Sequence, residues 1–287
     1  MVIIKPIMHE LNELSFERMM EIISIDGTCS EIEIDLKNTH FFVPYGLLLL
    51  IILLKSLSQK GLKVRLSLPD SSDVMNYLER MDFFTQIDGI VELNRDIQSL
   101  RTNIRNPADS IIEVTKIREE KEVMNIVNSL VDKLIDKHGF DRTRINRFGN
   151  VMSESLQNIP QHSNPDGTPY DGMACVQIYK KFFHFAVGDS GVGIYLSLNS
   201  NQRIRELNLS EKEALRKVIL EGFSRLDSPG RGVGFSSIRK IVRDMNGLMV
   251  VRSGGYTYFL GRRTENFYSV PPICGTQIGI RIPKEVF

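Results

Sequence analysis

Glu154 and Asn158 form the first pair of residues in this sequence whose types and spacing suggest chemistry. They stand four residues apart, so in a helix their side chains lie on one face. An amide oxygen is a suitable ligand for Mg²⁺, and a neighbouring carboxylate can orient or deprotonate a water molecule. Polar pairs at this spacing are also common on solvated helix faces, so a metal and water site needs support from other segments.

A second acidic residue, Asp189, follows an apolar segment at 182–187 that is typical of a buried strand. It opens the pattern Asp189-x-Gly191-x-Gly193. The glycines let the backbone approach a planar ligand closely, while the carboxylate can accept a hydrogen bond from an exocyclic amine. Taken alone, this pattern is more often an ordinary glycine turn.

A second glycine-rich segment contains Gly230, Arg231, Gly232 and Gly234, and it leads into a predicted helix at 236–245. The free N–H groups and the dipole of a helix N-terminus both favour anions. The segment therefore predicts a phosphate site, to which Arg231 can add positive charge.

The elements that position these segments follow from hydrophobic periodicity and capping residues. Residues 111–138 are predicted to form an amphipathic helix that Gly139 closes. Asp141 caps the next helix, which carries Glu154 and should end or kink at Pro160 because proline has no N–H to donate.

Further along the chain, Ser210 and Glu213 predict a capping box at the start of another helix. The last predicted strand covers residues 275–283 and opens with a glycine and a hydroxyl, Gly275-Thr276.

The first hundred residues alternate between helix and strand patterns. The predicted elements are helix 16–24, strand 32–36, a strongly apolar helix that begins at Pro44 and ends at Gly61, strand 62–68 and helix 73–81. This order indicates a small α/β unit with a parallel pair of strands.

Composition is that of a globular protein with two domains. The chain has 287 residues, of which 42% are hydrophobic and 25% charged. Three scattered cysteines fit reduced thiols better than disulfides. The start of the chain does not resemble a signal peptide, and the longest apolar run, at 47–54, is too short to cross a bilayer. We therefore expect a cytoplasmic protein without a membrane partner.

Bulk charge gives no support for a nucleic-acid partner, since 36 basic residues nearly balance 35 acidic ones. Basic residues near the C-terminus are interspersed with apolar positions and follow the predicted phosphate loop, which favours solvated faces over a nucleic-acid surface. They are Arg239, Lys240, Arg243, Arg252, Arg262 and Arg263.

Taken in order, the chemical segments of residues 115–285 resemble the GHKL ATPase superfamily, which includes DNA gyrase B subunits, Hsp90, histidine kinases and MutL. Residues 154–162 look like its asparagine box, 189–193 like its first glycine box and 230–235 like its second, with Gly275-Thr276 as the final match. The resemblance implies a Bergerat-type α/β sandwich that binds ATP and Mg²⁺.

The resemblance also implies a role for each matched residue. Asn158 would coordinate Mg²⁺ and Glu154 would activate the attacking water. Asp189 would accept a hydrogen bond from the adenine amine, with Thr276 assisting through its hydroxyl or a water. The implied loop residues are Gly191 and Gly193 on the adenine side and Gly230, Arg231, Gly232 and Gly234 around the triphosphate, within a mobile lid at about 197–235.

The N-terminal pattern at about 20–95 resembles the STAS fold of sulfate transporters and anti-anti-sigma factors. In anti-anti-sigma factors a serine near the start of the first long helix accepts phosphate, whereas Tyr45 has the only hydroxyl at 43–46 of this chain. The resemblance thus implies protein interaction or self-association rather than a phosphoswitch. We predict an α/β protein with a STAS-like interaction domain at 1–105 and a GHKL ATP-binding domain at 106–287.

Three functions remain open at this point. Glu154 favours an ATP-hydrolysing conformational switch, because hydrolysis requires an activated water. The STAS-like partner domain favours a protein kinase of the anti-sigma or histidine-kinase type. The third function is a non-enzymatic ATP sensor.

Overall fold

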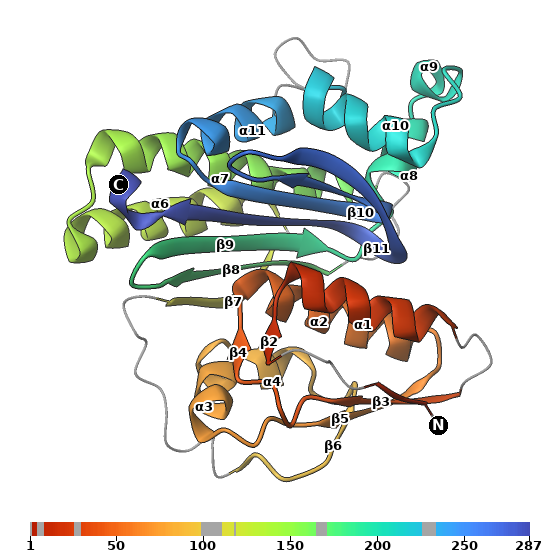
Figure 1. The fold of residues 1–287 in the computed structure, drawn as a ribbon. Helices are drawn as coiled ribbons and strands as arrows, with labels where there is room; N and C mark the ends of the chain where they lie inside the picture. The colour runs from red at the N-terminus through yellow and green to blue at the C-terminus, as the bar shows by residue number, and fades with distance from the viewer. Residues whose placement is uncertain are drawn as a thin grey trace.

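The computed structural model describes residues 2–4, 9–25, 30–98, 111–117, 119–164, 171–225 and 234–287. The described residues form a mixed α/β structure with a four-stranded sheet, a five-stranded sheet and a short two-stranded sheet, and helices pack between and above the two larger sheets (Figure 1). The predicted domain limit between residues 105 and 106 lies outside the described residues, as do Gly230, Arg231 and Gly232.

The N-terminal unit is built on a parallel sheet with the strand order β1-β3-β5-β6. Its elements are β1 (Val2–Ile4), β2 (Glu10–Leu11), α1 (Glu13–Ile25), β3 (Glu31–Asp35), β4 (Phe41–Phe42), α2 (Pro44–Gln59), β5 (Lys63–Ser67), α3 (Ser72–Arg80), α4 (Phe83–Gln86) and β6 (Glu92–Leu93). The predicted α/β order and the parallel pairing are confirmed.

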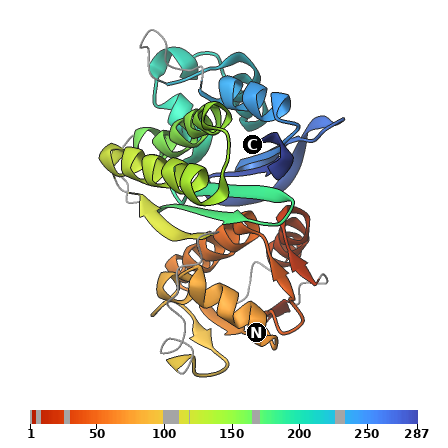
Figure 2. The ribbon, with the colours of Figure 1, turned by 90° about the vertical axis from the view of Figure 1, so that its left-hand side faces the viewer.

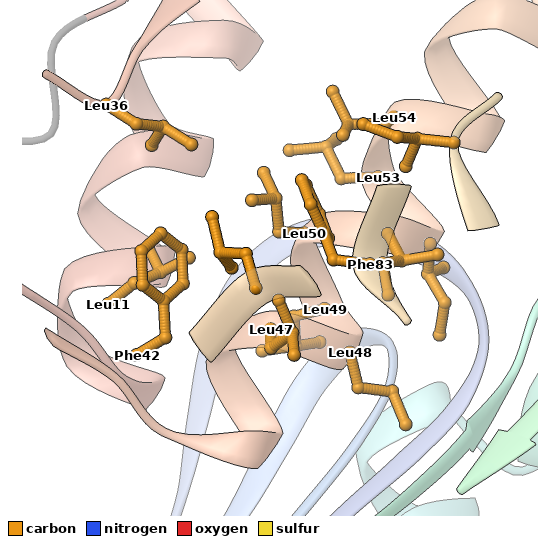
Figure 3. Packing of buried hydrophobic residues seen from close by; sticks show 14 of the residues in the cluster. Leu11, Leu36, Phe42, Leu47, Leu48, Leu49, Leu50, Leu53, Leu54 and Phe83 are labelled. Carbon is orange, nitrogen blue, oxygen red and sulfur yellow. The ribbon is translucent and has the colours of Figure 1, made fainter. Parts of the chain in front are cut away.

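Helix α2 is the centre of this unit. Pro44 stands in its first turn, where a missing N–H costs nothing. Thirteen of its sixteen residues are buried, so it must be covered on more than one side. Figure 3 shows its leucines packed among Leu11, Phe42 and Phe83 of neighbouring elements.

The C-terminal unit is an antiparallel sheet with the order β10-β11-β9-β8-β7. Its strands are β7 (Ile111–Ile117), β8 (Gly172–Ile178), β9 (Phe182–Asp189), β10 (Leu248–Leu260) and β11 (Glu265–Pro283). Its helices are α6 (Glu120–His138), α7 (Arg142–His162), α8 (Gly193–Asn199), α9 (Gln202–Arg205), α10 (Glu211–Arg216), the π-helical η1 (Lys217–Glu221), α11 (Gly234–Asp244) and the final 3₁₀ turn η2 (Lys284–Val286).

The two faces of this sheet are covered by different parts of the chain. Helices α6, α7 and α11 lie on one face, whereas α1 and α2 of the N-terminal unit lie on the other (Figures 1 and 2). Glycines of the sheet permit this close approach: a methyl group at Gly279 would lie 2.8 Å from the ring of Tyr45, and one at Gly188 would lie 2.8 Å from Leu48. Tyr45 is only 6% exposed, so its hydroxyl is not accessible for phosphorylation.

One prediction about local structure was wrong, and for a second, that the helix should end or kink at Pro160, the structure excludes an end there. Residues 111–117 form a strand rather than the start of a helix, because five of the seven residues are β-branched and the segment pairs with β8. Helix α7 does not end before Pro160 but continues to His162. Pro160 stands in the last turn, where it removes one helical hydrogen bond and leaves the next one, from Ser163 N–H to Ile159 O at 3.0 Å, in place.

Candidate functional site

A cavity of about 580 Å³ lies on the helical side of the C-terminal sheet. Its lining comes from α7, the end of β9, α8, residues 223–225, the start of α11 and β11. Of the residues predicted from sequence, Glu154, Asn158, Asp189, Gly193, Gly234 and Thr276 line it together. Segments that are far apart in the sequence therefore meet in one place.

Helix α7 presents Glu154 and Asn158 to this cavity while Val151 and Leu156 are buried beneath it. Asn158 Nδ2 donates a hydrogen bond to the main-chain oxygen of Glu154 at 2.8 Å. This contact fixes the amide so that Oδ1, the atom that can ligate a cation, is the end left without a hydrogen bond to the described residues. Within the same part of the chain, the Glu154 carboxylate also forms no hydrogen bond or ion pair.

Asp189 ends strand β9 at the floor of the cavity and is 5% exposed. One carboxylate oxygen accepts the N–H of Gly191 at 2.8 Å, and the other accepts the N–H of Thr276 at 3.3 Å. Burial raises the pKa of Asp189 from an ordinary 3.8 to about 6, although the Gly191 hydrogen bond opposes this shift. The group is a buried acceptor with lone pairs left for a ligand.

Gly275 is required by the backbone around Asp189. Its φ is +78°, and a methyl group there would lie 1.9 Å from the Asp189 carbonyl oxygen. Gly193 likewise has a φ of +77°, and a methyl group there would lie 2.9 Å from Ser253 Oγ. Both glycines therefore allow the loop to lie close to the strand ends.

Ser253 and Gln277 support the same loop and were not predicted from sequence. Ser253 Oγ accepts the N–H of Ile194 at 2.8 Å and lies 3.3 Å from Thr276 Oγ1. Gln277 Nε2 donates to the Asp189 carbonyl oxygen at 3.0 Å. Neither residue belongs to a short motif: the pairing of β10 with β11 brings Ser253 beside Thr276, and the pairing of β11 with β9 brings Gln277 beside Gly188.

Arg225 is a second contributor that the sequence did not reveal. It lines the cavity, donates a hydrogen bond to the main-chain oxygen of Gln161, and has a buried Nε without a partner among the described residues. A guanidinium with a free donor at the edge of the cavity suits an anionic ligand.

Two residues of the second glycine segment, Gly234 and Phe235, lie within the described chain. Gly234 begins α11 beside Glu154. A methyl group on Gly234 would lie 2.9 Å from Glu154 Oε2. The N-terminus of α11 and the carboxylate thus face the same end of the cavity.

We expect Gly234→Ala to displace the Glu154 side chain and to disturb the protein little otherwise, because the atom it meets is the end of a flexible side chain. The ATP hydrolysis predicted from the sequence should fall about tenfold or more, a typical consequence of moving a catalytic group by about 1 Å. Thermal unfolding should shift by only a few degrees. Steady-state kinetics and a melting curve measure both; unchanged turnover would contradict this placement of Glu154.

The nucleoside binding predicted from the sequence should weaken as pH falls through about 6, because protonation of Asp189 turns one of its acceptor oxygens into a hydroxyl donor. Adenosine is the suitable probe, since it has no phosphate that titrates in this range. Titrations between pH 5 and pH 8 should show affinity falling up to about tenfold per pH unit at the acid end. A flat profile would contradict a role for this carboxylate.

The effect of Asp189 on folding stability has the opposite pH dependence to its effect on nucleoside affinity: stability falls as pH rises. Its folded-state pKa, about 6, lies above the ordinary value of 3.8, so the folded protein binds the extra proton between these values. Its stabilising contribution is therefore complete below pH 3.8 and is lost as pH rises through about 6. Burial of this charge is a cost of the site.

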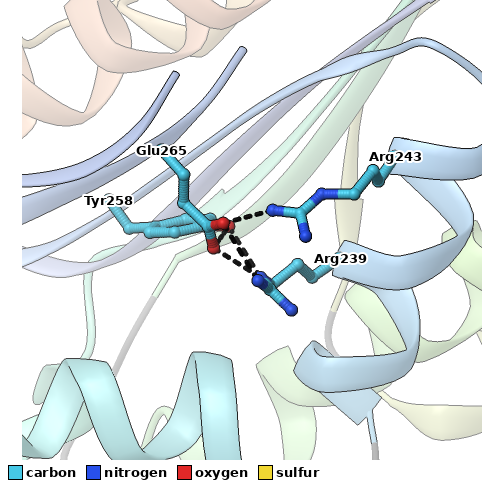
Figure 4. A network of polar contacts seen from close by, with 4 residues as sticks. All are labelled: Arg239, Arg243, Tyr258 and Glu265. Atoms are coloured by element: carbon cyan, nitrogen blue, oxygen red, sulfur yellow. Dashed lines mark hydrogen bonds and ion pairs between the residues drawn. The ribbon is translucent and has the colours of Figure 1, made fainter. Parts of the chain in front are cut away.

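Three of the basic residues near the C-terminus, Arg239, Arg243 and Arg252, are held in ion pairs. Arg239 and Arg243 of α11 both bind Glu265, which also accepts a hydrogen bond from the Tyr258 hydroxyl at 2.8 Å (Figure 4). The hydrogen bond from Arg239 is the main reason that the pKa of Glu265 is lowered to about 2. Arg252 is fully buried and pairs with Glu17 of α1 at 2.8 Å.

Two negative findings concern the described part of the chain. It contains no group of three or more His, Cys, Asp or Glu side chains that could hold a metal ion by themselves. None of its helices combines the length and apolar character needed to cross a membrane.

Of the comparisons with known proteins, the one with solved structures finds matches. No protein-family model matches the sequence, and no curated protein matches it. Among solved structures, the catalytic domain of the histidine kinase ThkA in a nucleotide-free form aligns with 60% of this chain and 99% of that domain, at 20% identity and a TM-score of 0.29. The function of the site has to be inferred from its own residues.

Proposed function

We propose that the chain is a Mg²⁺-dependent ATP-binding protein of the GHKL type that hydrolyses ATP as a conformational switch. The observation that supports it most directly is the arrangement within the cavity. A buried acceptor, Asp189, lies at the floor, and Glu154 and Asn158 lie on the adjoining helix. Adenine, metal and water chemistry would each have a residue of the type it needs.

Asp189 would bind the adenine amine. Its two oxygens are held by the N–H groups of Gly191 and Thr276, so the carboxylate is oriented before a ligand arrives. Preorganisation of this kind lowers the cost of binding. Gly193 and Ser253 would keep the loop beside the base without crowding it.

Asn158 fits a Mg²⁺ ion that is held mainly by the nucleotide. Its Nδ2 is engaged by Glu154 O, which leaves Oδ1 for the cation. Mg²⁺ usually keeps several waters and binds through few protein ligands plus phosphate oxygens, and this agrees with a site that offers one amide. When bound, the ion would neutralise phosphate charge.

Glu154 would act as the general base, orienting a water and accepting its proton. Nothing in the described part of the chain neutralises its carboxylate, and it faces the N-terminus of α11 at Gly234. The phosphates would lie near that N-terminus, where N–H groups favour anions. Arg225 would add charge from the other wall.

We extend the proposal to the rest of the chain as follows. Residues 197–235 would act as a lid that closes over ATP, with Gly230, Arg231 and Gly232 in the part that wraps the triphosphate. The units at 1–105 and 106–287 would be a STAS-like interaction domain, for a partner protein or self-association, and the ATP-binding domain. Free thiols at Cys175 and Cys274 suit a cytoplasmic location.

Incubation with γ-labelled ATP and Mg²⁺ tests the proposal against its alternatives. Released phosphate is expected for the switch. Label transferred to this chain or to an added protein would identify a kinase, and binding without either product would identify a sensor. Absence of any ATP binding would overturn all three.

A further inference from the structure

The N-terminal unit reaches the candidate site through one buried cation, Lys55 of α2. The eight residues before it, 47–54, are all apolar, and the Lys55 side chain is itself only 7% exposed. Its Nζ lies 2.9 Å from Oδ2 of Asp171, the residue before β8. A buried ammonium needs such a partner, so this position in α2 is tied to a particular point of the C-terminal unit.

Asp171 is tied in turn to the loop that carries Asp189. The N–H of Asp171 donates to Ser190 Oγ at 2.9 Å, and the N–H of Ser190 donates back to Asp171 O at 3.1 Å. Ser190 stands directly between Asp189 and Gly191, whose N–H holds the Asp189 carboxylate. A chain of direct contacts therefore leads from Lys55 to the floor of the cavity.

Two more contacts of α2 reach the other segments around Asp189. Leu48 packs against Gly188, the residue before Asp189, closely enough that a methyl group there would lie 2.8 Å from it. Cys274, the residue before Gly275, packs against the apolar cluster that contains the buried residues of α2. One helix of the N-terminal unit thus contacts all three backbone segments that enclose the carboxylate.

We propose that α2 positions the loop at 189–191, with Lys55 acting through Asp171 and Ser190, so that nucleotide affinity depends on the N-terminal unit. This inference rests on the proposed binding of adenine nucleotides. Lys55 does not line the cavity and touches no ligand there; it is a positioning residue. A protein that displaces α2 would change nucleotide affinity, and bound nucleotide would alter the binding of that protein to the same extent.

The test compares binding of ADP with binding of inorganic triphosphate, both with Mg²⁺, to the full chain. Lys55→Met keeps the length of the side chain and removes its charge. It should weaken ADP binding about tenfold, within the range found for residues that couple separate sites, and leave triphosphate binding within about twofold. Lys55→Arg should restore most of the ADP affinity, since it can keep the ion pair.

Lys63→Met is the matched control, because Lys63 also pairs with a carboxylate, Glu92 at 3.1 Å, but is 57% exposed on the N-terminal sheet. It should bind both ligands as the wild type does. If Lys55→Met fails to fold, Asp171→Asn tests the same contact from its more exposed side, at 37% exposure, with the same expected result.

Three results would overturn the inference. ADP affinity equal to that of the wild type in both variants would show that the contact does not position the loop. Equal weakening of ADP and triphosphate would indicate a general structural effect. Absence of adenine-nucleotide binding by the wild-type protein would overturn the proposed function itself. Because this measurement uses the wild type alone, it is made before any variant and is distinct from the other two results.

Discussion

Asp189→Asn should bind adenine nucleotides about 10- to 100-fold more weakly than the wild type, the range expected when a hydrogen bond to a charged group is lost. The wild-type carboxylate already gives one oxygen to Gly191 N–H and the other to Thr276 N–H. An amide has only one acceptor oxygen and would turn its NH₂ toward one of these donors or toward the adenine amine. Calorimetric titration with ADP and GDP measures the loss.

The change should also reduce the preference for ADP over GDP, since the carboxylate is the group proposed to recognise the amine. Asp244→Asn is a matched control on the surface of α11, where Asp244 pairs with Arg147 outside the cavity. It should leave both affinities unchanged. Equal binding of ADP and GDP by the wild type, unaltered by Asp189→Asn, would exclude the adenine role.

Much of the positioning framework was predictable from local patterns. Pro44 correctly predicted the start of α2, and Gly61, with a φ of +79°, lies just after its end. Ser210 and Glu213 form the predicted capping box. Glycines and caps act within a few residues, so their signals are complete in the sequence itself.

The errors arose where tertiary pairing decides the outcome. Residues 111–117 precede a true helix, and their apolar spacing was extended from it, although pairing with β8 makes them a strand. Pro160 was expected to end or kink α7. The helix does not end there, because one lost hydrogen bond in a last turn is tolerated when neighbouring residues are packed, and Leu156 and Ile159 are both buried.

The site shows the same division. Short motifs in the sequence predicted Glu154, Asn158 and Asp189, which line one cavity, whereas Arg225 and Ser253 are placed by contacts with residues about 60 positions away. The apolar character of α2 predicted burial, but not that a second sheet covers it. Because α2 packs against that sheet, the N-terminal unit contacts the segments that surround Asp189.

The buried pair of Arg252 with Glu17 supports this view from a second point. Arg252 follows Val251 in β10 and precedes Ser253, which holds the loop at Ile194. Burial raises the pKa of Glu17 while Arg252 opposes the shift. A pair of this kind is costly to separate, so the two units should unfold together rather than as independent domains.

Glu154→Gln should reduce ATP hydrolysis about 10²- to 10⁴-fold, the usual cost of losing a positioned general base, with little change in affinity. The glutamine keeps the shape of the side chain but cannot accept the proton of water. The wild-type Glu154 carboxylate forms no hydrogen bond or ion pair with the described residues, so the fold should be unaffected. Single-turnover phosphate release measures the rate, and equilibrium titration measures the affinity.

Separation of rate from affinity is what identifies the base. Glu285→Gln, an exposed change in η2 at the end of the chain, should alter neither quantity. Slow turnover of the wild type alone does not decide the matter, because lid motion can limit kcat; the ratio of the two rates does. If Glu154→Gln hydrolyses ATP at the wild-type rate, the proton is accepted elsewhere. If it loses affinity and rate equally, Glu154 holds the nucleotide instead of activating water, since a base acts only in the transition state.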